Sequence, residues 1–237
     1  MTKPGQFPLP LSHPPRYGRE DYLVGEANQV AMEWIDRWPD WPGPVTCLVG
    51  PSGAGKTHLM TIWQRQSQAL ALDIDVLEPT QIGELAEAAT SFTLDDAERL
   101  IGSAAAEEGL FHLFNRLRAD GGHLLLTSSQ GPARWDIQLP DLASRLKTVP
   151  LIQLAPPDDI MMAALLVKQF SDRQLDLPGA VIDYMLKRME RSYAAVQALV
   201  AALDQQALAK QRAITIPMVR EVMDQLDAAS DRSEEDI

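Results

Sequence analysis

Cysteine is nearly absent from the 237-residue sequence, which contains a single one, Cys47. One cysteine cannot form a disulfide framework, which excludes the small secreted proteins that depend on such frameworks. No apolar run reaches the roughly 20 residues that a membrane-spanning helix needs. Lys3 is not followed by the apolar segment of a secretory signal. Together these absences predict a cytoplasmic protein.

Clustered positive charge is also missing. The chain has 21 Lys and Arg residues against 33 Asp and Glu residues, a formal net charge of −12 at pH 7. A surface that grips DNA neutralises phosphates with grouped lysines and arginines, so we expect no strong direct binding to DNA. The hydrophobic fraction of 46% is enough for the core of one α/β domain and a smaller second domain.

The most specific motif is a glycine-rich loop between an apolar strand-like run, residues 45–49, and a segment with the apolar spacing of a helix. Strand, glycine-rich loop and helix in this order are typical of a phosphate-binding loop (P-loop), in which backbone N–H groups surround the phosphates. The nucleotide-binding residues that this motif predicts are Gly50, Pro51, Ser52, Gly53, Ala54, Gly55, Lys56, Thr57 and His58.

Lys56 and Thr57 have specific expected roles in this loop. The lysine is expected to reach the β- and γ-phosphates, and the threonine hydroxyl to complete the shell of a Mg²⁺ ion. The N-terminus of the following helix adds partial positive charge at the same point. A chance match in a turn is the alternative. Because the flanking strand and helix agree with the loop, we expect ADP or ATP to bind here with Mg²⁺.

Two adjacent carboxylates, Asp95 and Asp96, end the short predicted strand 91–96. In a P-loop protein this pattern predicts a metal site formed by Asp95 and Thr57, with Asp96 beside the attacking water. A solvated strand end that happens to be acidic is the alternative. The P-loop upstream favours the first interpretation.

The rest of the chain predicts an α/β protein with a five-stranded parallel sheet and a following helical lid. Helical segments separate the predicted strands, which is typical of a mostly parallel sheet. The predicted strands are 45–49, 69–76, 91–96, 123–127 and 148–154, and the later helices are 158–170, 178–190, 193–212 and 217–226. The predicted domains are a flexible tail (1–15), a nucleotide-binding α/β domain (16–155), a helical lid (156–227) and a disordered end (228–237).

Two segments before the P-loop suggest binding roles. In the proline-rich tail, Gln6, Phe7, Leu9 and Leu11 are spaced on a stiffened, extended backbone that suits an apolar groove on a partner. An ordinary disordered terminus is the alternative. Further on, the extended segment that contains Tyr22 and Val24 can pack on an adenine base, which needs apolar walls. Plain core residues are the alternative for its aromatic side chains.

These motifs resemble an AAA+ ATPase of the DnaA branch and, within that branch, the short regulatory homologues of the Hda type. The resemblance covers residues 17–226. It is carried, besides the P-loop, by segments 21–28, 110–115, 124–128, 142–146, 203–204 and 214–217.

The resemblance implies a negative regulator of the initiation of chromosome replication. Its implied partners are the initiator DnaA and the sliding clamp of DNA polymerase, which segment 6–11 would bind. Arg145, in segment 142–146, would act as an arginine finger on ATP held by DnaA. A surface ion pair is the alternative for Arg145, and a homodimer is left open.

Two residues depart from the pattern of the branch. Ser129 stands where the sensor I strand usually ends in Asp, and Ala194 stands in place of the sensor II arginine, with Arg191 one helical turn earlier as a substitute. The lost charge on the γ-phosphate side predicts bound ADP and little intrinsic ATPase activity. An autonomous ATPase similar to a helicase loader, or a nucleotide-gated adaptor without a hydrolytic role, remains an alternative.

Overall fold

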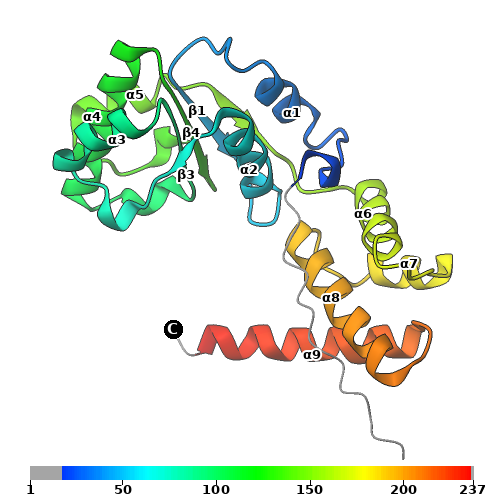
Figure 1. Ribbon diagram of the computed structural model, residues 1–237. Helices are drawn as coiled ribbons and strands as arrows, with labels where there is room; N and C mark the ends of the chain where they lie inside the picture. The colour runs from blue at the N-terminus through cyan, green and yellow to red at the C-terminus, as the bar shows by residue number, and fades with distance from the viewer. Residues whose placement is uncertain (1–17, 236–237) are drawn as a thin grey trace, which may run out of the picture. The chain divides into compact units, whose positions relative to one another are not determined.

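The computed structural model describes residues 18–235, without the side chains of Val76 and residues 229–235. Contacts within the chain divide it after Pro156 into two compact units. The first unit contains the sheet and the helices that cover it, and the second contains only helices (Figure 1). Among the described residues, no helix is both long and apolar enough to cross a membrane.

The sheet of the first unit confirms the predicted five-stranded parallel arrangement. Its order is β2-β3-β4-β1-β5, and all four neighbouring pairs are parallel. Val49 pairs with Ser128 and Leu94 with Leu126, so β1, β3 and β4 end at one edge. The strands are β1 (Val45–Val49), β2 (Leu70–Ala71), β3 (Ser91–Leu94), β4 (His123–Ser128) and β5 (Leu151–Gln153).

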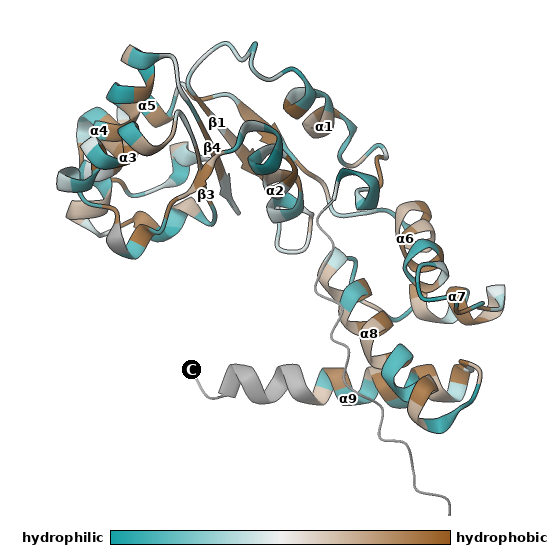
Figure 2. Ribbon diagram, in the orientation of Figure 1, coloured by the Kyte–Doolittle hydropathy of each residue, from teal (hydrophilic) through white to brown (hydrophobic). Residues whose placement is uncertain are grey.

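Helices cover both faces of the sheet, so every residue of β1 is buried (Figure 1). Cys47 and alternate strand residues pack under α4 and α5, whereas Leu48 and Leu125 pack under α1 and α2. The central strands β1, β3 and β4 are accordingly mostly hydrophobic (Figure 2). The helical elements are η1 (Arg19–Asp21), α1 (Gln29–Asp36), α2 (Lys56–Ser67), η2 (Ile74–Val76), η3 (Pro79–Gln81), α3 (Ile82–Ala88), η4 (Ala97–Leu100), α4 (Ala104–Asp120), η5 (Pro132–Arg134) and α5 (Pro140–Leu146).

Tryptophans fix α1 and α2 against the sheet. The ring of Trp41 stacks on that of Trp63, with 5.1 Å between the centroids. The Trp41 indole N–H donates to the Trp34 carbonyl at 2.9 Å, and the Trp34 indole N–H donates to the Thr46 hydroxyl of β1 at 3.2 Å. Because Trp63 lies on α2, these contacts help to hold the helix that begins at the P-loop.

Three strands are shorter than the sequence predicts. Strand β3 covers Ser91–Leu94, not 91–96, because the chain turns at Asp96, whose backbone is left-handed. Strand β2 covers only Leu70–Ala71, not 69–76, because the Asp73 carboxylate accepts the Asp75 N–H at 3.0 Å and turns the chain into η2. Strand β5 covers Leu151–Gln153, not 148–154, because residues 147–149 complete the turn that ends α5.

The second unit consists of four helices around a core that includes Leu166, Phe170 and Leu203. The helices are α6 (Asp159–Ser171), α7 (Gly179–Leu186), α8 (Tyr193–Lys210) and α9 (Ile216–Glu235). Helix α9 extends nine residues beyond its predicted end at residue 226, because the sequence has neither glycine nor proline after Pro217 to stop it.

The N-cap of α6 is Asp158, the first residue of the predicted helix 158–170. The Asp158 carboxylate accepts the Met161 N–H at 2.7 Å. We predict that Asp158→Ala lowers the free energy of unfolding by about 1 kcal/mol, because one N–H of the first turn loses its partner. Urea unfolding followed by circular dichroism measures the change.

Asp183→Ala is the matched control, because Asp183 is exposed on α7. It removes the same charge without removing a cap and should change the free energy of unfolding by less than about 0.5 kcal/mol. Equal effects of the two substitutions would show that the cap contributes nothing.

Candidate nucleotide-binding site

The glycines of the P-loop are required by its backbone. Gly53 and Gly55 have φ angles of +72° and +91°, a region that side chains disfavour. A Cβ atom on Gly50 would lie 2.5 Å from the Leu154 carbonyl oxygen. The chain therefore makes a tight loop between β1 and α2 that leaves room for phosphate oxygens, which fits a bound nucleotide.

Lys56, the first residue of α2, folds back over this loop. Its Nζ donates to the Gly50 carbonyl at 2.9 Å and to the Pro51 carbonyl at 3.1 Å, and the residue is only 8% exposed. An ammonium group has three donors. One donor therefore remains for a phosphate oxygen while the other two brace the loop.

Asp95 lies at the centre of the polar contacts beside the loop. Its Oδ2 accepts the Thr57 hydroxyl at 3.0 Å, and its Oδ1 accepts the Thr127 hydroxyl. The structure thus brings together Thr57 and Asp95, the residues predicted to hold Mg²⁺. Within residues 18–235, no three His, Cys, Asp or Glu side chains could hold a metal together. The ion would need phosphate and water oxygens as well, which Mg²⁺ commonly uses.

The sequence analysis did not identify Thr127 as a site residue. Its hydroxyl accepts the Asp96 N–H at 2.9 Å and donates to Asp95, so it joins the ends of β3 and β4. The register pairs Leu94 with Leu126, which places Asp95 beside Thr127. Aligning the two apolar runs at their last leucine would have found this pair.

Asp96 lies exposed at the same edge, in a left-handed backbone conformation with φ of +45°. Partial burial raises the pKa of Asp96, and the neighbouring carboxylates of Asp95 and Glu98 act in the same direction. Lys56 and Arg99 oppose this rise. The assignment of Asp96 to an attacking water stays a prediction.

Ser129 follows the last residue of β4 and is bound by a carboxylate that the sequence analysis missed. The Ser129 N–H donates to Glu98 Oε1 at 2.7 Å. Burial alone would raise the pKa of Glu98, but hydrogen bonding with Ser129 outweighs burial and lowers it. Glu98 lies on η4, and no spacing rule linked it to β4 in advance.

The predicted adenine-binding segment packs beside α2. Tyr22 is buried and meets the His58 ring edge-on, with 5.0 Å between the centroids, and His58 Nε2 lies 3.2 Å from the Gly18 carbonyl oxygen. Burial lowers the pKa of His58. Val24 is 54% exposed. These contacts tie the segment to the helix that follows the P-loop, and its contact with a base stays a prediction.

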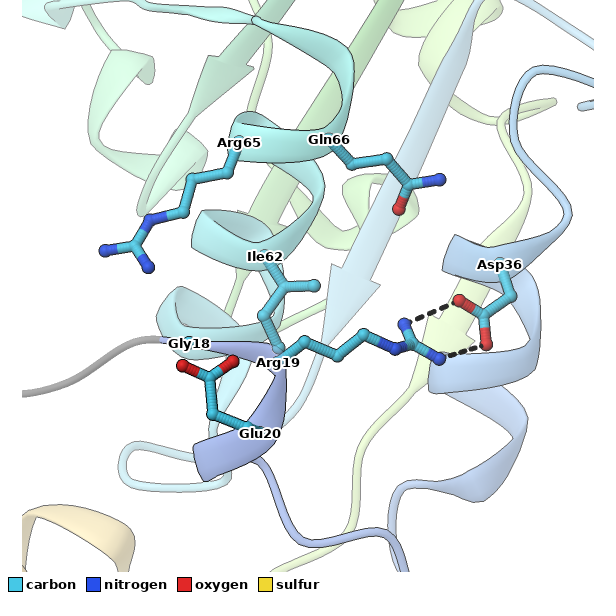
Figure 3. A pocket seen from close by; sticks show the side chains of 7 residues that line it. All are labelled: Gly18, Arg19, Glu20, Asp36, Ile62, Arg65 and Gln66. Carbon is cyan, nitrogen blue, oxygen red and sulfur yellow. Dashed lines mark hydrogen bonds and ion pairs between the residues drawn. The ribbon is translucent and has the colours of Figure 1, made fainter.

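A pocket of about 490 Å³ opens on the outer side of this segment (Figure 3). Arg19 crosses it and bonds both oxygens of Asp36, at 2.6 and 2.7 Å. The lining residues are Gly18, Arg19, Glu20, Asp36, Ile62, Arg65 and Gln66. None of them belongs to the predicted nucleotide site, so the pocket gives that site no support.

Arg145, the predicted arginine finger, lies half-buried on α5 against α4. Its guanidinium carbon is 4.8 Å from the centroid of Phe111 and 5.6 Å from that of Phe114, and Nη1 donates to the Asn115 amide oxygen. Within the described residues Arg145 makes no ion pair, so the alternative of a surface ion pair finds no support there. The aromatic rings fix the guanidinium without neutralising its charge.

The remaining predicted residues lie outside the first unit or outside the described residues. Arg191 pairs with Asp159 within the second unit at 2.8 Å, with both side chains more than half exposed, and Ala194 is exposed on α8. Their role toward a nucleotide stays a prediction. Gln6, Phe7, Leu9 and Leu11 lie outside the described residues.

Comparisons with known proteins give a family match for the helical unit and a sequence relative of the chain. Residues 159–223 match the family model of the lid domain of Hda. An uncharacterised protein of Haemophilus influenzae is 28% identical over 227 residues, which cover 92% of this chain and 98% of that protein.

Solved structures share the fold. Domain III of the replication initiation protein DnaA from Thermotoga maritima matches with a TM-score of 0.75 at 19% identity, covering 88% of this chain and 96% of that one. AMPPCP-bound DnaA from Aquifex aeolicus matches with a TM-score of 0.69 at 20% identity, covering 94% of this chain and 70% of that one. The chain therefore has the AAA+ fold with a following lid.

The Thr127 hydroxyl bridges the Asp95 carboxylate and the Asp96 N–H, and Thr127→Val tests the importance of this bridge. We predict that this substitution lowers the free energy of unfolding by about 1–3 kcal/mol, because the Asp95 carboxylate and the Asp96 N–H both lose a partner. Nucleotide binding in Mg²⁺ should weaken as well. Urea unfolding and calorimetric titration with ADP measure the two effects.

Thr90→Val serves as the control, since Thr90 is exposed and directly precedes β3. It makes the same chemical change next to the same strand and should leave both measurements unchanged. If Thr127→Val also leaves both unchanged, the bridge is not needed.

Proposed function

Because the chain is a DnaA-like AAA+ protein of the Hda type, we propose that it restrains the initiation of chromosome replication by stimulating ATP hydrolysis on DnaA. The observation that carries this proposal is the match of residues 159–223 to the Hda lid domain, in a chain of which 88% shares the fold of DnaA domain III. DnaA left with ADP would then be unable to start a second round.

Arg145 supplies the chemistry in this proposal. A guanidinium group stabilises negative charge that develops on the γ-phosphate during hydrolysis. Phe111, Phe114 and Asn115 hold the side chain in one orientation on the surface of α4. An arginine that is already oriented loses little side-chain entropy when a partner's nucleotide meets it.

The chain's own nucleotide has a structural role in this proposal. Lys56 would hold its phosphates, and Thr57 and Asp95 would hold Mg²⁺, which neutralises phosphate charge when bound. Ala194 adds no positive charge where a sensor II arginine would. We propose that ADP remains bound and that the chain itself hydrolyses ATP slowly or not at all.

The sliding clamp is the proposed tether. Gln6, Phe7, Leu9 and Leu11 would bind it, which makes the encounter with DnaA on the same DNA effectively intramolecular. This arrangement would confine stimulation to DNA on which a clamp has been loaded, that is, to DNA that has just been replicated.

An autonomous ATPase is the second candidate. The intact contacts from Thr57 through Asp95 to Thr127 favour it, because they are the kind of contacts that a hydrolysing P-loop site needs. The two candidates differ in which protein hydrolyses its bound ATP: DnaA in the first, this chain in the second. Hydrolysis of free ATP by this chain alone, stimulated by DNA, would support the autonomous ATPase.

We predict that Arg145→Ala lowers the stimulation of DnaA ATP hydrolysis by about 1,000-fold, the lower end of typical arginine-finger effects. Asn115→Ala should lower it less, because the guanidinium keeps its charge but loses one contact that orients it. The measurement follows labelled ATP on DnaA in the presence of clamp loaded on DNA.

Arg118→Ala is the control, because Arg118 is exposed in the last turn of α4. The substitution removes an arginine from α4, the helix against which Arg145 packs, but leaves Arg145 and its contacts in place. The stimulation of DnaA ATP hydrolysis should therefore be unchanged. Full stimulation by Arg145→Ala would refute the finger.

The tether can be tested by replacing Gln6, Leu9 and Leu11 with alanine together. We expect stimulation on clamp-loaded DNA to fall by about 100-fold, since the gain from tethering is lost. At high protein concentration without clamp, the triple variant and wild type should stimulate equally. A triple variant that remains fully active on clamp-loaded DNA would contradict clamp tethering but not the role of Arg145.

A further inference from the structure

Glu98 is the residue of the first unit whose position the nucleotide chemistry described above leaves unexplained. It is a half-buried carboxylate on η4, three residues after Asp95. Its Oε1 accepts the Ser129 N–H at 2.7 Å, whereas its Oε2 is buried and has no hydrogen-bond partner in the described part of the chain. No Lys or Arg of residues 18–228 forms an ion pair with it.

The contacts of its neighbours place Glu98 at the phosphate end of the site. Gly50, the first residue of the P-loop, donates its N–H to the Ser128 carbonyl at 3.2 Å. Ser129, the residue after Ser128, donates its N–H to Glu98. The tip of β4 therefore touches the P-loop on one side and the Glu98 carboxylate on the other.

Electrostatic effects agree with this position. The charge of Glu98 helps to raise the pKa of the Asp96 carboxyl, and both Glu98 and Lys56 act on the Cys47 thiol, in opposite directions. Glu98 is thus near enough to the P-loop strand and to the acidic edge to act on charges there. Asp95, Asp96 and Glu98 are thus three neighbouring carboxylates, and at Asp96 the positive charges of Lys56 and Arg99 act against the other two.

We propose that Glu98 contributes to the preference of this site for ADP over ATP, in addition to the missing positive charge at Ala194. The inference rests on the proposed nucleotide site. A γ-phosphate would bring additional negative charge to the tip of β4, where Glu98 already holds the backbone of Ser129. ADP ends one phosphate earlier and avoids that repulsion. Glu98 acts here as a specificity-determining residue and touches no reacting atom.

The geometry also explains how the site keeps a carboxylate at this edge without an Asp at position 129. Ser129 has no charge of its own, but its N–H anchors a glutamate that comes from η4. A carboxylate that is held by the backbone of β4 moves with β4.

The test measures binding of ADP and of a non-hydrolysable ATP analogue, each with Mg²⁺, by calorimetric titration of the full chain. Wild type should bind ADP more tightly. Glu98→Gln keeps the shape and an acceptor for the Ser129 N–H but removes the charge. It should lower the ADP preference by about tenfold, chiefly through tighter binding of the ATP analogue.

Three further variants sharpen the result. Glu98→Asp keeps the charge and should retain most of the preference, which a loss of packing alone would not predict. Glu84→Gln removes an exposed charge on α3 and should change nothing. If thermal unfolding shows that Glu98→Gln does not fold, Glu98→Ala provides the second neutral variant.

The outcomes separate this inference from the proposed function. An unchanged ratio of the two dissociation constants in a folded neutral variant overturns the role of Glu98 and leaves the nucleotide site intact. Failure of wild type to bind either nucleotide overturns both together. Stimulation of DnaA by Arg145 is measured independently and does not enter this result.

Discussion

The carboxylate of Asp95 is the contact on which the candidate site depends. It accepts hydroxyl groups from Thr57, at the start of α2, and from Thr127, near the end of β4. It therefore joins three segments that are far apart in the sequence. This junction requires β1, β3 and β4 to end at one edge, which the hydrophobic core on both faces of the sheet enforces. The P-loop, the acidic edge and Glu98 all take their positions from it.

Arg145 and the lack of an arginine at position 194 both fit the proposed regulator better than an autonomous ATPase. Arg145 is held ready by aromatic rings on the surface of its own unit, and the position expected to carry a sensor II arginine holds Ala194. In the proposed function, Arg145 would supply positive charge to a neighbouring nucleotide, and Ala194 would supply none to the chain's own. A division of this kind lets a nucleotide stabilise the fold while catalysis is directed elsewhere.

Local patterns in the sequence predicted most of the fold and part of the site. The P-loop and Asp95 were predictable because each is defined by residues adjacent in the chain, and the parallel sheet because helices alternate with apolar strands. Thr127 and Glu98 were missed because their roles arise from strand register and from a turn between distant segments. Strand β2 was overestimated because the Asp73 turn interrupts an apolar run that looks continuous.

The stacked indoles of Trp41 and Trp63 bear on the fluorescence of the protein. All five tryptophans, Trp34, Trp38, Trp41, Trp63 and Trp135, precede Pro156, and the helical unit after it contains none. Trp63 and its partner Trp41 are attached to the helix that begins at the P-loop. Tryptophan emission therefore comes from the α/β unit alone. Under excitation selective for tryptophan, a change in its wavelength or intensity would report movement of α2 without a contribution from the helical unit, whose fluorescent residues are Tyr184 and Tyr193.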